Sequence, residues 1–357
     1  MQKMKAALWY GAKDIRVEEV DQPTPGRGEV KLKVKASGIC GTDLHEYVSG
    51  PHVIPVDAPH PLTGNKAPLI MGHELSGEII EIGPEVSGWK EGDRVTIMPL
   101  LSCGRCFYCI RGLRHLCQYF GATGLQWHWG GFSDYCLAKD YQLNTVPENV
   151  SYDHGAVIEP TALAVYAIDR GEVKAGDVVF IAGGGPTAVL TLMAAQAAGA
   201  SAVYMSELAK GRLERLKDFG ATEVFNPIEC NVVDEILKRT DRVGADVTID
   251  CTGIQAAIRQ CLQIVRKRGM HVQSGLSVED VRINTFDLAF KDVTMRGLWC
   301  YHIYDFPKIL ALLSAGKFQL ERFITKRIKL QDIVKEGFEV LTSEQSGNEL
   351  KIIVTLS

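Results

Sequence analysis

The stretch from residue 178 to residue 206 constrains the fold most, because it contains no charged residue. It is long enough for a membrane-spanning helix. However, the run GGGP at residues 183–186 divides it into a short apolar segment, 178–182, and a helix-length segment, 187–199. A buried strand, a tight turn and a buried helix explain this division better than a membrane span does.

The part of the chain after residue 155 alternates between short apolar runs and helix-length segments. We expect strands at 178–182, 202–206, 223–225, 246–250, 270–274 and 294–299. Helices are expected between them, at 187–198, 209–219, 232–239 and 255–266. Such alternation predicts βαβ units and therefore a parallel sheet.

The first 150 residues have a different pattern, in which apolar and polar residues alternate with period two. Short strands are expected at 15–20, 29–36, 75–82, 94–98 and 132–138. The tail predicts helices at 306–315 and 330–341 and a last strand at 350–355. The sequence thus predicts an α/β protein, in which a doubly wound parallel-sheet domain, 158–301, is inserted into a β-rich domain, 1–157 and 302–357.

The turn after the first strand of the parallel sheet fits the pattern G-x-G-x-x-A of dinucleotide-binding domains. Glycine permits a tight turn and a close approach of the backbone to a pyrophosphate, and the following helix offers it free N–H groups. We therefore expect the dinucleotide to bind at Gly183, Gly185, Pro186 and Thr187. Proline suits the first helical turn, because its missing N–H would have no partner there.

An acidic residue, Glu207, follows the next strand of the predicted sheet. A carboxylate at that place accepts hydrogen bonds from the adenosine ribose and repels a 2′-phosphate, which favours NAD over NADP. The nearby cations Lys210 and Arg212 could partly neutralise this carboxylate. We include Arg212 among the expected cofactor-binding residues.

Four cysteines lie in one short loop with the spacing C-x2-C-x2-C-x7-C: Cys103, Cys106, Cys109 and Cys117. Four thiolates so close together can complete a tetrahedron around Zn²⁺, which predicts a structural zinc site with no open position. Two disulfides or a redox centre are the alternatives, and both fit less well in a reducing compartment with no cysteine pair at a helix start. Arginines beside the loop also occur in zinc ribbons that bind nucleic acid, but here we expect them to balance the thiolates.

A second set of possible metal ligands is spread along the chain, with Cys40 in one segment, His73 and Glu74 in another, and Glu159 in a third. A thiolate, an imidazole and a carboxylate together suit Zn²⁺, and three protein ligands with an open fourth position describe a catalytic zinc. Taken singly, Cys40 is more often a buried apolar residue and each glutamate a surface acid. Spacing alone therefore does not decide whether these residues form a metal site.

Composition limits the classes of partner. The chain has 39 lysines and arginines and 43 aspartates and glutamates, so its net charge of −4 provides no basic field for nucleic acid or an anionic membrane. Ten cysteines in 357 residues are too few for a disulfide scaffold, and the first residues lack the apolar core of a signal peptide. We therefore expect a cytoplasmic protein.

Four motifs occur in a characteristic order: GHE at 72–74, the four-cysteine loop, EP at 159–160 and the glycine turn. In these motifs the chain resembles the zinc-dependent medium-chain dehydrogenase/reductase family over essentially its whole length. The resemblance implies a GroES-like catalytic domain with an inserted Rossmann domain, a small-molecule alcohol or ketone as substrate, and a homodimer or homotetramer. The segment CGTDLHEY at 40–47 is most similar to members that act on (R,R)-2,3-butanediol, with sorbitol dehydrogenases as close relatives.

The resemblance also implies roles for individual residues. Cys40, His73 and either Glu74 or Glu159 match the ligands of the catalytic zinc. Asp43 would accept the second N–H of His73 and so orient this ligand. The two glutamates remain alternatives, and we expect one of them to give up its position when the substrate binds.

The implied reaction transfers a hydride between NAD and a secondary alcohol or vicinal diol, or reduces acetoin or diacetyl in reverse, with a sorbitol- or xylitol-type polyol as the alternative. Thr42 and His45 would carry the proton away, although Thr42 could equally be a helix N-cap and His45 a surface residue. The strand at 294–299 is expected at a sheet edge, where relatives pair it with a second subunit. Side chains expected to set substrate size are Tyr47, Ile54, Phe120, Leu276 and Trp299.

Overall fold

Strand β3 (Glu29–Gly38) organises the first of two units in the computed structural model, which describes residues 2–277 and 279–356. Its period-two pattern buries Val30, Leu32, Val34 and Ala36 completely. The first unit comprises residues 1–159, 302–316 and 320–357, and the second comprises residues 160–301 and 317–319.

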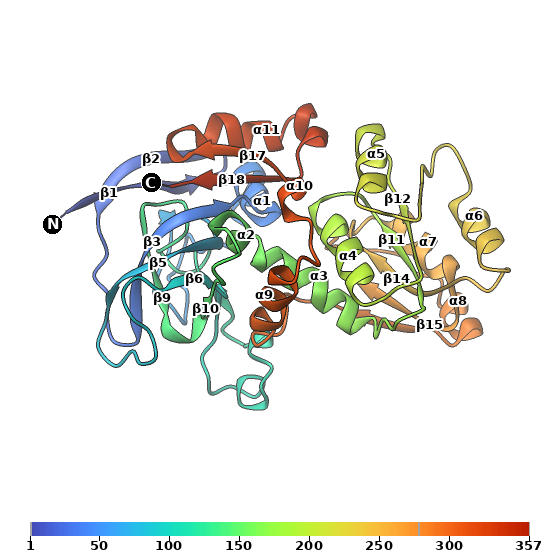
Figure 1. Ribbon diagram of the computed structural model, residues 1–357, viewed down its shortest axis with the longest axis horizontal. Coiled ribbons are helices and arrows are strands. Elements are labelled where there is room, and N and C mark those ends of the chain that lie inside the picture. Colours follow the sequence, from blue (N-terminus) through green and yellow to red (C-terminus); the bar gives the residue numbers. More distant parts are fainter. Residues whose placement is uncertain (1, 278, 357) are drawn as a thin grey trace. The chain divides into compact units, whose positions relative to one another are not determined.

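The main sheet of the first unit has seven strands, which include β3. The others are β5 (Glu74–Ile82), β6 (Arg94–Ile97), β9 (Tyr135–Lys139), β10 (Leu143–Thr145), β17 (Ile324–Lys329) and β18 (Lys351–Thr355). β18, near the C-terminus, lies between β3 and β17 (Figure 1). The end of the chain therefore packs directly beside a strand from its beginning.

Smaller elements complete this unit. They are β1 (Lys3–Gly11), β2 (Asp14–Asp21), β4 (Leu69–Ile70), β7 (Leu100–Leu101), β8 (Gly121–Ala122), α1 (Gly41–Ser49), α2 (Tyr152–Ala156), α9 (Phe306–Ser314), α10 (Leu320–Phe323) and α11 (Glu339–Leu341). The sequence did not predict β1, because residues 6–9 are buried in succession and hide the period of two.

The second unit contains a parallel six-stranded sheet in the order β13-β12-β11-β14-β15-β16. Its strands are β11 (Val178–Ala182), β12 (Ala202–Ser206), β13 (Glu223–Phe225), β14 (Ala245–Asp250), β15 (Val265–Gln273) and β16 (Thr294–Gly297). The strand order reverses at β11, and such a switch point is where ligands bind in sheets of this kind.

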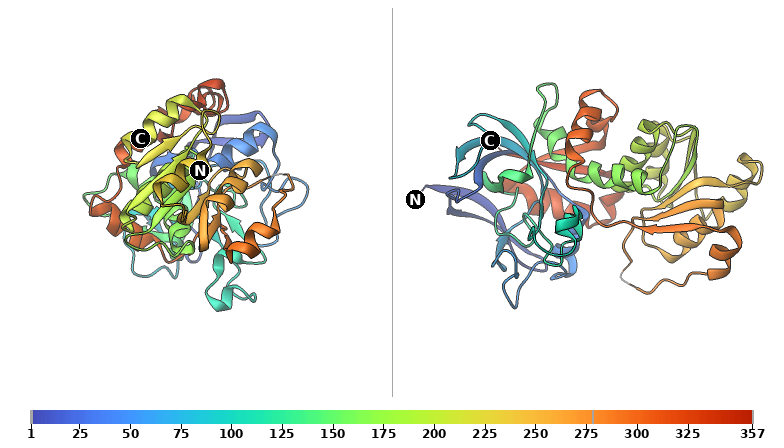
Figure 2. Two further views of the ribbon diagram at one scale, coloured as in Figure 1. Left: turned by 90° about the vertical axis from the view of Figure 1, so that its right-hand side faces the viewer. Right: turned by 90° about the horizontal axis from the view of Figure 1, so that it is seen from below.

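Helices lie on both faces of this parallel sheet (Figure 2). They are α4 (Pro186–Ala197), α5 (Lys210–Asp218), α6 (Val232–Arg239), α7 (Gln255–Ile264) and α8 (Thr285–Lys291), and α3 (Ile158–Arg170) precedes them in the chain. The sequence did not predict α3 and α8. It also extended α7 to residue 266, whereas β15 already begins at Val265 because the chain continues there into a long strand.

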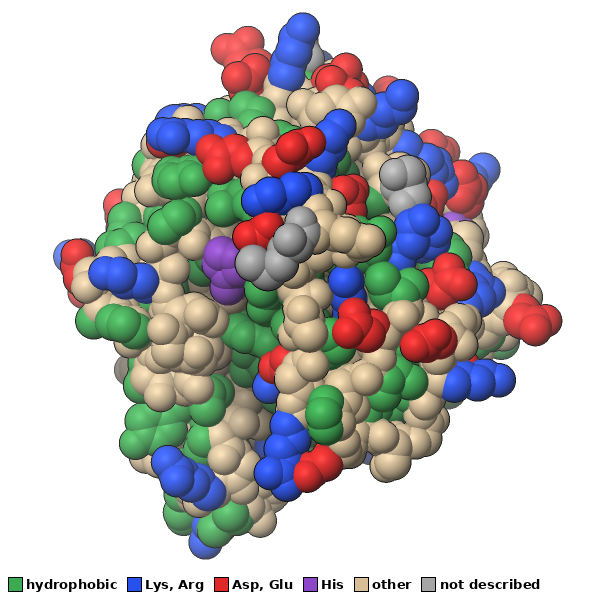
Figure 3. Space-filling model, turned by 90° about the vertical axis from the view of Figure 1, so that its left-hand side faces the viewer, with side chains coloured by type: hydrophobic (Ala, Val, Ile, Leu, Met, Phe, Trp, Pro, Cys, Tyr) green, Lys and Arg blue, Asp and Glu red, His purple; other side chains and the backbone are tan. Residues whose placement is uncertain are grey.

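Surface charge and hydropathy agree with the composition. On the face of the first unit that Figure 3 shows, basic and acidic side chains are intermixed and form no patch of one sign. Within residues 2–277 and 279–356, no helix has both the length and the apolar character needed to cross a membrane.

Candidate active site

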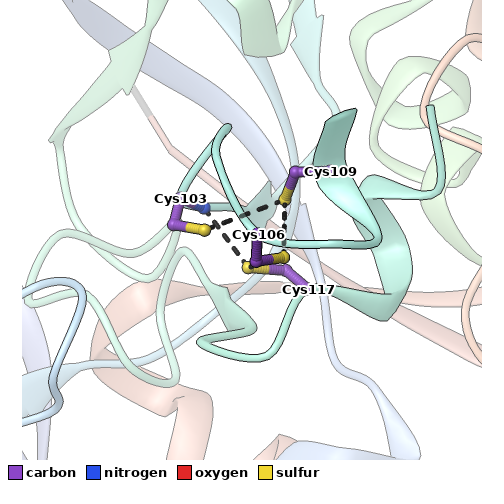
Figure 4. A group of neighbouring side chains, drawn as sticks. All are labelled: Cys103, Cys106, Cys109 and Cys117. Carbon is purple, nitrogen blue, oxygen red and sulfur yellow. Dashed lines mark hydrogen bonds between the residues drawn. The ribbon is translucent and has the colours of Figure 1, made fainter. Parts of the chain in front are cut away.

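The four cysteines of the loop after β7 point toward one another (Figure 4). The Sγ–Sγ distances are 3.4 Å from Cys106 to Cys109, 4.0 Å from Cys106 to Cys117, and 3.9 Å from Cys103 to Cys109. A tetrahedron with Zn–S bonds of about 2.3 Å has edges of about 3.8 Å. The loop therefore fits a zinc ion, and its cysteines are free thiols rather than disulfides.

The thiols of this loop differ in acidity. Hydrogen bonds from the backbone N–H groups of Gln118 and Cys109 lower the pKa of Cys106 to about 6. Burial raises the pKa of Cys117 to about 12. A thiolate is the form that binds metal, and a bound metal would remove the protons that the thiols of the loop still carry.

The dispersed ligand set is also brought together. Cys40 is the N-cap of α1, directly after β3, and His73 and Glu74 stand where β5 begins. Because β3 and β5 are antiparallel neighbours with Gly38 opposite Glu74, the two segments meet. One ligand atom from each of the three residues lies within 4.8 Å of the other two, and this donor set suits a catalytic zinc.

Asp43 connects two members of this set. Its fully buried carboxylate accepts the N–H of Cys40 through Oδ2 at 3.0 Å, and its Oδ1 lies 3.4 Å from Nδ1 of His73. Burial by itself lowers the pKa of His73, but Asp43 and Cys40 raise it well above its ordinary value. Because Nδ1 faces Asp43, Nε2 is the nitrogen left for a metal.

Lys351 is a residue of this site that the sequence analysis missed. It is 3% exposed, and its Nζ donates to both carboxylate oxygens of Glu74, at 2.8 and 2.7 Å, and to the carbonyl oxygen of Ile39 at 2.9 Å. The available signal was a lysine inside the apolar run of the last strand. A cation buried there needs a buried anion.

Glu159 lies in the first turn of α3 and is not part of the 4.8 Å group. Burial lowers the pKa of Lys351, but the negative charges of Glu74, Cys40 and Glu159 together raise it above its ordinary value. Glu159 is therefore close enough to act electrostatically on the site.

Thr42 lies inside the first turn of α1, with Oγ1 at 3.9 Å from Sγ of Cys40. The alternative that Thr42 is a helix N-cap is wrong, because Cys40 occupies that position. His45, one turn further along α1, is exposed. Thr42 and His45 thus lie on the same helix, between the half-buried thiol of Cys40 and solvent.

The side chains expected to set substrate size lie in different surroundings. Tyr47 and Ile54 are 5% and 3% exposed and belong to the apolar core of the first unit, where the Tyr47 ring packs on Phe338 at 5.0 Å. Phe120 packs against the cysteine loop. Leu276 and Trp299 are exposed side chains of the second unit.

In the second unit, a cavity of about 450 Å³ opens where β11 and β12 end. It is lined by Gly183, Gly184 and Gly185 on one side and by Glu207 and Arg212 among others. Gly183 has φ +107°, a conformation that favours glycine. Close packing also requires glycine at position 184, because a Cβ there would come 2.6 Å from Oε2 of Glu207.

The predicted helix start is present behind this cavity. Gly185 is the N-cap of α4, and Pro186 and Thr187 form its first turn. The N–H groups of that turn have no partner within the helix and are available to a phosphate.

Glu207 is held in a fixed position at the cavity wall. Its Oε1 accepts the N–H groups of Leu208 and Ala209 at 2.8 and 2.9 Å. Arg212 lies 3.9 Å from Oε2, which is too far for a hydrogen bond. Oε2 therefore keeps its capacity to accept a hydrogen bond from a ligand hydroxyl.

Comparisons with known proteins agree with this geometry. Residues 26–148 match the alcohol dehydrogenase GroES-like domain, and residues 186–315 match the zinc-binding dehydrogenase family. The chain is 40% identical to (R,R)-butanediol dehydrogenase of Bacillus subtilis (strain 168), over 98% of this chain and 99% of the relative. The chain is a zinc-dependent medium-chain dehydrogenase.

This medium-chain dehydrogenase is also 31% identical to sorbitol dehydrogenase of Halalkalibacterium halodurans, over 97% of both chains. The crystal structure of 2R,3R-butanediol dehydrogenase from Bacillus subtilis has a TM-score of 0.93 at 39% identity, covering 99% of this chain and 100% of that one. A zinc-binding dehydrogenase from Sinorhizobium meliloti 1021, bound to NADP, has a TM-score of 0.90 at 30% identity with the same coverage.

Family membership confirms several sequence predictions for the medium-chain dehydrogenase. The fold combines a GroES-like domain with a Rossmann-type parallel sheet. The protein is an oxidoreductase that acts on the CH–OH group of a small molecule, and its cofactors are zinc and NAD(H).

Proposed function

We propose that this medium-chain dehydrogenase oxidises (R,R)-2,3-butanediol to acetoin with NAD⁺ and catalyses the reverse reduction of acetoin or diacetyl. The observation that carries the proposal is the group of half-buried Cys40 with buried His73 and Glu74, in a chain 40% identical over 98% of its length to an (R,R)-butanediol dehydrogenase. The sorbitol dehydrogenase relative, at 31% identity, is more distant.

We assign Cys40, His73 and Glu74 as residues that would hold the catalytic zinc, and Glu159 as the carboxylate whose place the substrate takes. When bound, zinc lowers the pKa of the alcohol, and NAD⁺ accepts the hydride from its carbon. A thiolate and two carboxylates exceed the charge of Zn²⁺ by about one unit. Lys351 removes this excess, because its ammonium group is paired with Glu74.

Both oxygens of Glu74 are bound by Lys351, which fixes this glutamate. Glu159, in the first turn of α3, lies outside the group of ligand atoms within 4.8 Å of one another, and this supports its assignment as the residue that yields.

The chain's own residues would orient the ligands and carry the proton. Asp43 accepts the backbone N–H of Cys40, and its Oδ1 lies 3.4 Å from Nδ1 of His73, so it would orient two ligands at once. Thr42 has a hydroxyl that both donates and accepts, at 3.9 Å from the Cys40 thiol. We propose that it passes the proton released by the alcohol toward His45, whose exposed imidazole delivers it to solvent.

We propose NAD rather than NADP as the preferred cofactor. Glu207 presents an oxygen to which Arg212 makes no hydrogen bond, next to the glycine turn. A carboxylate there accepts hydrogen bonds from the ribose hydroxyls and repels a 2′-phosphate. All ten cysteines are free thiols, four of them grouped as a zinc site, which supports a reducing cytoplasmic setting.

We further propose a homo-oligomer that forms through β16. This strand pairs with β15 on one side, and three of its four residues are exposed. Nearby, the stacked rings of Phe286 and Phe290 are 67% and 62% exposed. An open strand edge beside exposed aromatic rings suits pairing with a second copy.

Light scattering tests the oligomer. It should give the mass of a dimer or tetramer, and Met295→Lys should shift the protein to smaller species. An unchanged mass in Met295→Lys would contradict this assignment.

A substrate panel tests the proposed function. Following NADH absorbance, we expect (R,R)-2,3-butanediol to have the highest kcat/KM, with sorbitol and xylitol far behind. Strong turnover of the polyols with none of the diol would overturn the proposal.

A pair of variants connects the zinc ligand to turnover. Cys40→Ser should lose one of two zinc ions per chain and lose turnover. Cys230→Ser, at a thiol outside both ligand groups, should keep its two zinc ions and its turnover. Activity retained by Cys40→Ser would remove Cys40 from the reaction.

A further inference from the structure

We propose that Asp250 is the positioning residue of the dinucleotide cavity, holding the turn at residues 251–254 against the glycine turn. This inference rests on the proposed function, because it takes the cavity as the site of NAD(H). Asp250 is the last residue of β14 and belongs to neither of the two metal-ligand groups.

Hydrogen bonds, and no cation, satisfy the fully buried carboxylate of Asp250. Its Oδ1 accepts from N and Oγ1 of Thr252, at 3.2 and 2.7 Å. Its Oδ2 accepts from N of Gly253 and Nε2 of Gln273, at 2.8 and 2.6 Å. Among the described residues, no lysine or arginine forms an ion pair with Asp250. A buried carboxylate is tolerated only with such bonds, so this one requires the turn to keep its present shape.

The turn that Asp250 holds forms part of the cavity wall beside the glycine turn. Cys251, Thr252 and Ile254 line the cavity together with Gly183. A Cβ on Gly183 would come 2.9 Å from Cγ2 of Thr252, so the threonine methyl fills the space beside this glycine. A shift of Thr252 would therefore change the position of the backbone that meets the dinucleotide.

Asp250 also determines the position of a second loop. Its carbonyl oxygen accepts the N–H groups of Ser274 and Gly275 at 3.0 and 2.8 Å. A Cβ on Gly275 would come 2.2 Å from N of Gly253, so the two loops touch through their backbones with no room for side chains. One residue thus fixes both loops that follow β14 and β15.

The test separates this role from a contribution to stability alone. In Asp250→Asn, we expect the Kd of NADH, measured by fluorescence, and the KM for NAD⁺ to rise about tenfold, with kcat within about twofold of wild type. Asp246→Asn is the matched control, because Asp246 lies on the same strand and binds Val178 and Arg266 away from the cavity. Its NADH affinity should stay at the wild-type value.

A double variant supplies the decisive readout. In Asp250→Asn/Gln273→Glu, the amide of residue 250 donates to the new carboxylate, so the bond between β14 and β15 returns with donor and acceptor exchanged. The same amide then faces the N–H of Gly253, which stays without an acceptor. Nε2 of Gln273 also donates to the carbonyl oxygen of Gly275 at 2.7 Å, which a carboxylate at position 273 cannot do. We therefore expect the melting temperature to recover in part while NADH binding stays weak.

Each outcome decides between the alternatives. Recovery of NADH affinity in the double variant, or wild-type affinity in Asp250→Asn, would overturn the positioning role. If Asp250→Asn does not fold, Thr252→Val removes one donor while keeping the methyl group, and about a threefold weaker NADH affinity supports the role whereas no change overturns it. A wild-type enzyme that does not bind NADH would instead refute the proposed function.

Discussion

The buried ion pair between Lys351 and Glu74 predicts how much the free energy of unfolding falls when the lysine is replaced. Lys351→Met keeps the apolar part of the side chain and removes its charge. Glu74 is fully buried, so in the zinc-free enzyme its carboxylate would then lie in the core with no cation paired to it. Removing one partner of a buried pair costs about 3–5 kcal/mol, because the other charge stays desolvated.

Denaturant unfolding of the zinc-free enzyme, in which no metal compensates the charge of Glu74, measures this loss. Lys326→Met is the matched control on the neighbouring strand β17, because its pair with Glu336 is partly exposed and should contribute below about 1 kcal/mol. The double variant Lys351→Met/Glu74→Gln should recover most of the loss, since no charge remains unpaired. If the free energy of unfolding of Lys351→Met is no lower than that of Lys326→Met, the buried pair of Lys351 and Glu74 does not stabilise the fold.

Three further predictions concern the structural metal, the cofactor and pH. Cys103→Ser should reduce zinc from two ions to one per chain and lower the melting temperature, because three thiolates leave the tetrahedron incomplete; metal analysis that still finds two ions would contradict this. Glu207→Ser should raise the KM for NAD⁺ and lower that for NADP⁺, each about tenfold, and an unchanged ratio of kcat/KM values would exclude the ribose contact. Burial lowers the pKa of His271, so unfolding takes up a proton and stability falls as pH drops below about 6.5. Thermal unfolding between about pH 7.5 and 5.5 should depend less on pH in His271→Gln, and an equal slope in both proteins would count against a buried neutral imidazole.

Features that depend on neighbouring residues could be predicted from the chain alone. The strand, glycine turn and helix at 178–197 form as expected, because burial periodicity and glycine conformation act within a few residues. The four-cysteine loop is equally local, since all its ligands lie within 15 positions and the loop itself brings the sulfurs together. Strand β3 was predicted for the same reason, because its apolar residues alternate with charged or polar ones.

Contacts between distant segments could not be predicted from the sequence, because the order of strands in the sheets determines them. Lys351 meets Glu74 across 277 positions because β18 packs beside β3, and nothing in the local pattern around either residue encodes that neighbour. Tyr47 is buried in the core of the first unit because distant elements pack over α1. Asp250 reads in sequence as an ordinary acid at a strand end. Its burial and its four donors exist only because β15 and two glycine loops close over it.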